Sequence, residues 1–193
     1  MEKDFLQSLK IEISKNFKLV PYERNAFHRI LGIMKSENGL RILLRELKSV
    51  PEVRESAISV LKSFDSPQLL PLFTEMLLGD ECGFAEKMHI LDHLERFGSA
   101  EHAVRLIEFI EGRRGANDAT GLLLRAFEVL KVIGTGSEEV LKYLKSVAAN
   151  KEAAVELRCG AIEGLSAFKD ISFYEGFIRE RNDDILHSVF LSI

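Results

Sequence analysis

The sequence predicts an all-α protein: one domain of 193 residues built as a solenoid of about five short helical hairpins. Three observations predict this class. An apolar pattern typical of one helix face recurs along the chain, a second amphipathic stretch follows each copy, and turn-forming residues separate the two. A repeat of this kind indicates stacked helical units, in which each unit packs mainly against its neighbours.

The first helix of each unit is recognised by an eight-residue segment with apolar residues in its first, second, fifth and eighth columns. This spacing places them on one face of a helix with 3.6 residues per turn. An upstream segment, 26–33, fits the same frame more weakly, and the copies begin 31 to 36 residues apart. The four clear copies are 57–64, 90–97, 126–133 and 161–168.

The second helix of each unit follows a break that has its own chemistry. Ser66, Ser99 and Ser137 are N-cap candidates, because a hydroxyl oxygen accepts from free amides in the first helical turn. Gly98 and Gly134 are expected to adopt the left-handed conformation that closes many helices. Apolar stripes then resume at i, i+3, i+4 and i+7, for example Ala103/Leu106/Ile107/Ile110.

In chain order, residues 1–20 are expected to form an N-terminal capping helix, since solenoid ends need a cover. The repeats occupy 22–181, with units at 22–47, 52–78, 82–111, 119–149 and 151–181. The tail, 183–193, begins with two acidic residues, as helices often do, and ends in apolar ones. It is expected to be a terminal helix folded back on the fifth unit, or the start of a further repeat.

The repeated segments resemble HEAT-type repeats in their short bacterial form. The resemblance rests on Val53-Arg54 with Ala57, Val60-Leu61 and Asp65-Ser66-Pro67, and on Leu157-Arg158 with Ala161, Leu165 and Asp170. It covers about residues 22–181 and implies a right-handed superhelix whose second helices line a concave face. One departure is that the basic residue before the first column, Arg54, Lys87 or Arg158 in three units, is Leu123 in the fourth. Tetratricopeptide repeats have a similar period, but the aromatic pattern that they require is missing.

The composition bears on the kind of ligand, the cellular location and the state of the cysteines. A formal net charge of −4 disfavours nucleic acid as the main ligand. No apolar run is long enough for a membrane span, so the cytoplasm is the expected location. Cys82 and Cys159 lie in different units and are predicted to be free thiols, as is usual in a reducing compartment.

Two patterns in the sequence could indicate a functional site, but in both a purely structural role explains the residues better. His89 and His93 are four residues apart on a predicted helix, a spacing that suits a metal, but His93 occupies a repeat column filled elsewhere by Val60, Val129 and Gly164. It is therefore interpreted as a packing residue, and no metal site is predicted. HEAT-type iron hydroxylases resemble this architecture and carry His-Glu pairs, which this sequence lacks. The segment 134–137 lacks the strand and the Lys-Ser/Thr of a phosphate loop.

The surface expected to bind a partner consists of the outward positions on the second helices. Glutamates interleave with basic residues there, which suits a protein segment better than a phosphate backbone. A Gly-rich loop around Arg113 and Arg114 is expected to form a mobile rim. The predicted contact residues are Arg41, Arg45, Glu75, Arg105, Glu108, Lys142, Lys145 and Arg179.

From these features the sequence predicts a non-enzymatic scaffold that binds a protein partner, or another domain of a longer chain, along the concave face. No catalytic residue, metal or cofactor is assigned. The alternative is a HEAT-type accessory enzyme or chaperone similar to the phycobilin lyases, which resemble this short repeat form. Nucleic-acid binding is the third reading, disfavoured by the net charge.

Overall fold

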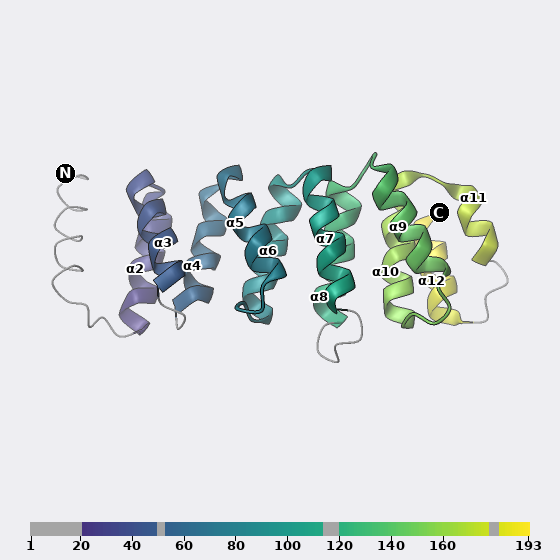
Figure 1. Ribbon diagram of the computed structural model, residues 1–193, viewed down its shortest axis with the longest axis horizontal. Helices are drawn as coiled ribbons and strands as arrows, with labels where there is room; N and C mark the ends of the chain where they lie inside the picture. Colours follow the sequence, from purple (N-terminus) through teal and green to yellow (C-terminus); the bar gives the residue numbers. More distant parts are fainter. Residues whose placement is uncertain (1–20, 50–52, 114–119, 178–181) are drawn as a thin grey trace. The chain divides into compact units, whose positions relative to one another are not determined.

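The computed structural model describes residues 21–49, 53–113, 120–177 and 182–193. All regular structure in these ranges is helical, which confirms the predicted all-α class (Figure 1). The expected capping helix at 1–20 lies outside them. None of the helices in these ranges combines the length and the apolar character that crossing a membrane requires. The chain divides into two compact units, residues 1–65 and 66–193.

Unit 1 contains α2 (Pro21–Met34), α3 (Glu37–Ser49) and α4 (Arg54–Leu61), the last extended by the 3₁₀ turn η2 (Lys62–Phe64). All three helices pack against one another. Their shared core consists of fully buried side chains, including Leu31, Leu43, Ile58 and Leu61.

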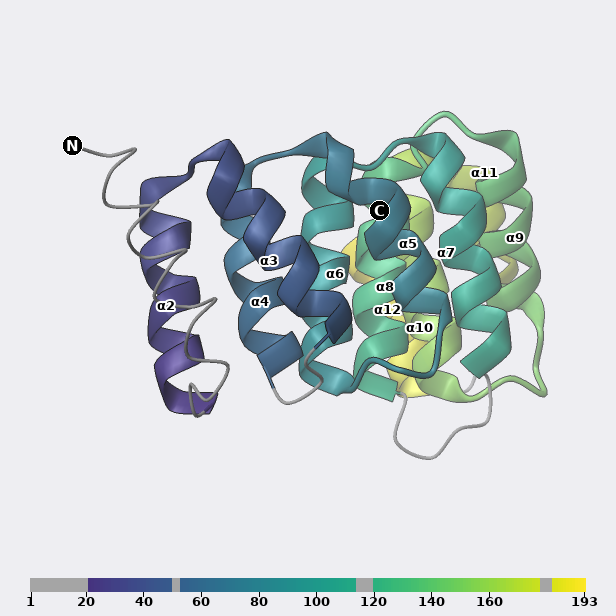
Figure 2. The same ribbon diagram turned by 60° about the vertical axis from the view of Figure 1, so that its left-hand side comes forward.

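Unit 2 consists of two layers of helices. In the first layer, α6, α8, α10 and α12 lie side by side, and in the second layer α5, α7 and α9 do so (Figures 1 and 2). Each second-layer helix also packs against the first-layer helix that follows it in the chain. The elements are η3 (Pro67–Leu69), α5 (Leu70–Leu78), α6 (Phe84–Phe97), α7 (Ala100–Arg113), α8 (Thr120–Ile133), α9 (Glu138–Ala149), α10 (Val155–Leu165), η4 (Ser166–Phe168), α11 (Ile171–Tyr174), η5 (Glu175–Phe177) and α12 (Asp183–Ser192).

The first, second and fifth apolar columns of the four clear repeat copies form the core, as their spacing predicts. In the eighth column only Ile133 is buried, and Phe64, Phe97 and Phe168 are half-buried. Residues of the first, second and fifth columns are at most 1% exposed in every copy. They are Ala57, Ile58 and Leu61; Ile90, Leu91 and Leu94; Ala126, Phe127 and Leu130; and Ala161, Ile162 and Leu165.

The frame expected for the upstream copy is wrong by one residue. Ile30 and Ile33, expected in the core, are 41% and 83% exposed, whereas His28 and Leu31 are completely buried. A shift of one position rotates a helix face by about 100°. Phe27 therefore corresponds to the first column and His28 to the second, where the other copies carry Ile, Leu, Phe and Ile.

The glycines at the helix ends have a different role from the one predicted. Gly98 has φ −67 and Gly134 is not among the positive-φ residues, so neither is left-handed. A Cβ at Gly98 would lie 2.4 Å from the carbonyl oxygen of Leu94, and one at Gly134 2.6 Å from that of Leu130. These positions thus need glycine for close approach, while left-handed conformations occur at Lys35, Asp65, Gly136 and Lys169.

Two buried basic side chains close the ends of second-layer helices. Lys87 on α6 donates from Nζ to the carbonyl oxygens of Leu77 (3.1 Å) and Gly79 (2.7 Å) at the end of α5. Arg158 on α10 donates from Nε to Ala148 at the end of α9, over 3.0 Å. Helices end with carbonyls that have no partner inside the helix, so the basic residue before the first column acts as a tertiary C-cap.

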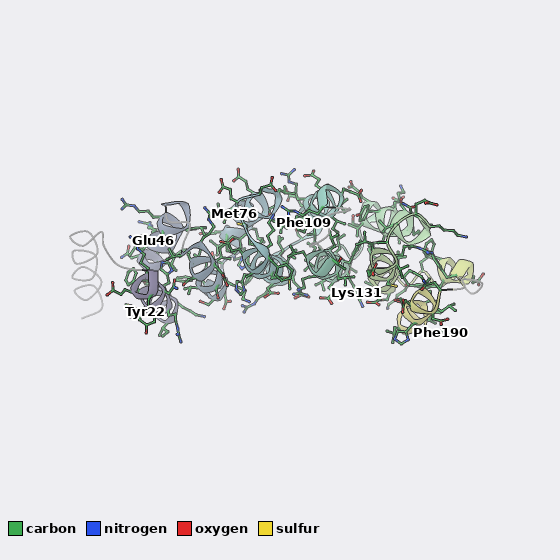
Figure 3. All side chains as sticks on the ribbon, turned by 90° about the horizontal axis from the view of Figure 1, so that it is seen from below. Tyr22, Glu46, Met76, Phe109, Lys131 and Phe190 are labelled. Atoms are coloured by element: carbon green, nitrogen blue, oxygen red, sulfur yellow. The ribbon has the colours of Figure 1, made fainter. Side chains whose placement is uncertain are left out.

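The C-terminal part of unit 2 differs from a regular hairpin. The second helix expected in the fifth unit is the short α11 followed by the 3₁₀ turn η5. The predicted tail helix is present as α12 and packs against α10, burying Ile185 and Val189. Phe190, 76% exposed, points away from the second layer (Figure 3).

Candidate functional site

The charged residues predicted to contact a partner lie on α3 in unit 1 and on α5, α7 and α9 in unit 2. On α7, Arg105 Nη1 donates to Glu108 Oε2 over 2.5 Å, and on α9 Lys142 Nζ is 2.8 Å from Glu138 Oε1. Both pairs are solvent-exposed. Water screens exposed ion pairs so that they contribute little to stability, and an approaching protein can therefore exchange them.

The other charged residues predicted to contact a partner lie partly in unit 2 and partly in unit 1. Lys145 forms an ion pair with Asp170, and its Nζ lies 5.4 Å from the ring centre of Phe173. Glu75 on α5 is exposed, and in unit 1 Arg41 donates to Glu37 over 2.6 Å while Arg45 is exposed. Arg179 lies outside the described residues.

The loop that was expected to form a mobile rim begins later than predicted, because its first residues are helical. Gly112 and Arg113 belong to α7, and Arg113 donates to Asp80 Oδ1 over 3.0 Å, with its guanidinium 5.8 Å from the ring centre of Phe109. Arg113 is therefore held against the body of unit 2. Arg114 and the rest of that loop fall in a range that the structure does not describe.

Of the two histidines that the sequence offers as metal ligands, His89 is half-buried on α6 and His93 lies in the core. His93 is fully buried, with Nε2 3.2 Å from the carbonyl oxygen of Ser66 and its ring edge-on to Phe73 at 5.0 Å. Within the ranges that can be described, no group of three or more His, Cys, Asp or Glu side chains is placed to hold a metal ion. His93 is a packing residue, as its repeat column indicates.

A different constellation lies in unit 1, where α2, α3 and α4 meet. His28 on α2 is completely buried, and its Nδ1 is 3.3 Å from Ser56 Oγ on α4. Its Nε2 is 4.0 Å from Oε2 of Glu46 on α3. Arg24 donates to the same carboxylate oxygen over 2.6 Å and so fixes its position. Figure 3 shows Glu46 on the side of α3 nearest α2.

The surroundings of His28 define its protonation state. Burial lowers the pKa of His28; the nearby Glu46 carboxylate raises this pKa in part, and Arg24 lowers it again. The ring is thus neutral at neutral pH. A carboxylate only accepts hydrogen bonds, so the tautomer that suits Glu46 carries its proton on Nε2 and leaves Nδ1 as an acceptor for the Ser56 hydroxyl.

Sequence reasoning missed this constellation. Its three members are far apart in the chain, and the one-residue error in the upstream frame put His28 in a column without a packing role. The signal was present nevertheless. In the corrected frame, a titratable side chain replaces Ile58, Leu91, Phe127 and Ile162 of the other copies.

Comparison with known proteins shows a likeness in fold to one solved structure. The sequence matches no protein-family profile and no curated protein. The structure is similar to that of human deoxyhypusine hydroxylase in complex with glycerol, with a TM-score of 0.52 and 14% sequence identity over 92% of this chain and 80% of that one. At this identity the likeness concerns the fold, and it fits the predicted HEAT-like solenoid.

This match corrects two predictions. The sequence was read as a non-enzymatic scaffold, and no enzymatic activity was assigned to it. The structure that resembles the chain is that of an enzyme. The finding favours the alternative reading, a HEAT-type accessory enzyme, over the scaffold. The reason for the error is that repeat periodicity reports the packing of helices and carries no information on chemistry between them.

Proposed function

We propose that this protein is a HEAT-type accessory enzyme or chaperone that acts on a protein substrate. The observation that supports this proposal is the match to an enzyme of the same fold over 92% of the chain. The phycobilin-lyase-like accessory proteins, which resemble the short repeat form, are the class that we favour. The two cysteines are free thiols, which suits a reducing compartment, and we place the protein in the cytoplasm on that ground.

The proposed fold is a right-handed superhelix of about five HEAT-like hairpins. The side-by-side packing of α6, α8, α10 and α12, with α5, α7 and α9 beside them, supports this arrangement in unit 2. In such a superhelix the second-layer helices form the inner face, which is where an extended substrate would lie.

The proposed substrate is recognised by charge on this face. Basic and acidic residues are mixed on this face: Glu75 on α5, Arg105 and Glu108 on α7, and Lys142 and Lys145 on α9. The exposed pairs among them are weak enough to exchange for contacts with a substrate of complementary charge. In unit 1, Arg41 and Arg45 are proposed to contribute in the same way.

The proposal does not include the iron-dependent hydroxylation that the fold family implies. The sequence contains no His-Glu pair, and the described residues offer no cluster of three metal-binding side chains. The described residues therefore do not fit an iron centre.

The test is to purify the tagged protein from nuclease-treated lysate of its source organism and to identify bound proteins by mass spectrometry. We expect a bound protein that is lost in the variant Arg105→Glu/Lys142→Glu, because reversing two charges on α7 and α9 repels the segment they hold. The control is Lys131→Glu/Lys151→Glu, which makes the same change in net charge at exposed positions outside α5, α7 and α9. Lys131 lies on the α8 side of unit 2 (Figure 3).

A second measurement separates an enzyme or chaperone from a passive binder. The covalent state and the solubility of the captured protein are compared between wild-type cells and cells that lack this chain. An accessory enzyme predicts a mass difference, and a chaperone predicts loss of soluble partner. If the partner is identical in both cells, the proposed function is wrong.

A further inference from the structure

Where α2, α3 and α4 meet in unit 1, a hydroxyl, an imidazole and a carboxylate lie in a row, each close to the next. Ser56 Oγ is 3.3 Å from His28 Nδ1, and His28 Nε2 is 4.0 Å from Glu46 Oε2. Each group comes from a different helix, so tertiary packing alone brings them together. His28 is completely buried, and its Nε2 has no hydrogen-bond partner.

We infer that Ser56, His28 and Glu46 form a hydrolytic site for carboxylic esters, with Ser56 as nucleophile, His28 as general base and Glu46 as the residue that positions the ring. This inference rests on the proposed enzymatic function and names its chemistry. The order serine, histidine, carboxylate is the arrangement by which an unreactive hydroxyl is activated.

The location of Ser56 suits this role. It lies in the first turn of α4, which begins at Arg54, and it is half-buried. Amides in the first turn of a helix have no partner within that helix, and the N-cap residue Val53 gives them no side-chain hydrogen bond. Such amides stabilise negative charge on oxygen, and a carbonyl attacked by Ser56 would develop that charge beside them.

The reaction balances with water as the only co-reactant. Ser56 Oγ bonds to the ester carbonyl carbon while its proton passes to His28 Nδ1. The bond between that carbon and the alcohol oxygen then breaks, and the alcohol takes the proton from His28. Water then gives a proton to His28 and attacks the acyl carbon. The bond between that carbon and Ser56 Oγ breaks, Ser56 takes the proton back from His28, and the carboxylic acid is released. Glu46 stabilises the imidazolium that exists between these transfers.

The other candidate nucleophile is less suited. Burial raises the pKa of the Cys159 thiol on α10; the Ser188 hydrogen bond lowers this pKa in part, and the nearby charges of Glu163 and Asp184 raise it. A thiol is a weak nucleophile compared with its thiolate. Burial of the imidazole has the opposite consequence at His28, because it keeps the base in its neutral, proton-accepting form.

The experiment treats the full chain with a fluorophosphonate probe, which bonds to activated serines, and locates the label by mass spectrometry. Hydrolysis of p-nitrophenyl acetate is followed in parallel. We expect label at Ser56 and a loss of about 100-fold or more in the rate of both reactions in Ser56→Ala. The matched control is Ser59→Ala, on the same helix with an exposed side chain, which should react as the wild type does.

A positioning role for Glu46 is tested by the pH profile. Glu46→Gln should slow labelling and move the pH midpoint of the reaction, since the charge that favours the imidazolium is gone. A purely structural glutamate would change the thermal unfolding midpoint and leave the pH midpoint of the folded protein where it was.

Two outcomes overturn the site: no labelling beyond that of heat-unfolded protein, or equal labelling of Ser56→Ala and wild type. The failures of the two proposals are distinguishable. If a captured protein is modified equally by wild type and Ser56→Ala, the site is wrong and the proposed function stands. If Ser56 reacts but cells lacking this chain have an unchanged partner, the site stands and the proposed function is wrong.

Discussion

At the scale of single residues, Lys87 needs an explanation, because its ammonium group is buried and the side chain is only 1% exposed. It is stabilised by the two carbonyls that it caps and by the ring of Phe109, whose centre is 5.5 Å from Nζ. Burial nevertheless lowers the pKa of Lys87, as expected for a charge moved away from water. Its presence is explained by the carbonyls at the end of α5, which need a donor.

We predict that Lys87→Met destabilises the protein by about 1–3 kcal/mol, because buried acceptors lose their donor while the aliphatic volume is kept. Urea unfolding followed by circular dichroism measures the change. Lys131→Met, at an exposed position on α8, is the control and should change stability by less than about 0.5 kcal/mol. Equal effects would mean that the C-cap role of Lys87 is unimportant.

We predict that His28 makes the stability of the protein depend on pH, with stability lost as the pH falls. Its pKa in the folded state is below the ordinary value of 6.5, chiefly because of burial. As the pH falls through 6.5, the unfolded chain binds a proton that the folded chain resists, so stability is full above 6.5 and decreases below it. One such group contributes a slope of at most about 1.4 kcal/mol per pH unit.

The measurement is urea unfolding of wild type and His28→Asn between pH 5 and 8. The difference in stability between the two proteins should shrink as the pH is lowered, because only the wild type loses the contribution of a neutral imidazole. A difference that stays constant over this range would contradict the assignment of a lowered pKa to His28.

These residues also mark how far the sequence alone was informative. The buried columns of four repeat copies follow from apolar spacing, since that spacing is what burial selects. The one-residue error at α2 arose because Ile30 and Ile33 imitate the pattern while His28 interrupts it. Local hydrophobicity cannot report that a polar side chain is buried with partners on two other helices, and for this reason the constellation with Ser56 and Glu46 was missed.

At the scale of helical elements, the turns between helices depend on how closely the chain packs. A Cβ at Gly98 or Gly134 would meet a carbonyl oxygen in the last turn of the helix that the glycine follows, that of Leu94 in α6 or of Leu130 in α8. The prediction that these glycines mark helix ends was correct, but the predicted reason, a left-handed backbone conformation, was wrong. The non-glycine residues with left-handed conformations in the described ranges are Lys35, Asp65 and Lys169. Lysine gives no sequence signal for this conformation, and aspartate gives only a weak one.

We predict that Gly98→Ala destabilises the protein by about 1–3 kcal/mol, since the added carbon meets the backbone oxygen of Leu94 and the side chain of Ile133. Gly112→Ala is the matched control. Gly112 lies within α7 with nothing near its missing Cβ, so alanine there should stabilise by up to about 1 kcal/mol through helix propensity. Thermal unfolding of both variants decides the matter, and a destabilised Gly112→Ala would show that this explanation is wrong.

At the scale of the whole molecule, the chain divides into two compact units, residues 1–65 and 66–193. In repeat architectures each element contacts only its neighbours, so stability is a sum of local terms and parts of the chain can open independently. The repeat pattern predicted stacked helices but placed no boundary at the turn after α4, because the apolar columns continue through it unchanged.

We therefore predict that Leu31→Ala, a completely buried position in unit 1, lowers protection in one unit only. Removing this core side chain costs about 2–5 kcal/mol, which is comparable to the stability of a small domain. In native-state hydrogen exchange, amides of α2, α3 and α4 should exchange faster by two to three orders of magnitude or more, while those of α8 and α10 should keep their wild-type rates. The reciprocal control, Leu130→Ala in unit 2, should spare α2 to α4. A uniform loss of protection in both variants would mean that the two units unfold as one, and the constellation around His28 would then depend on the packing of the entire chain.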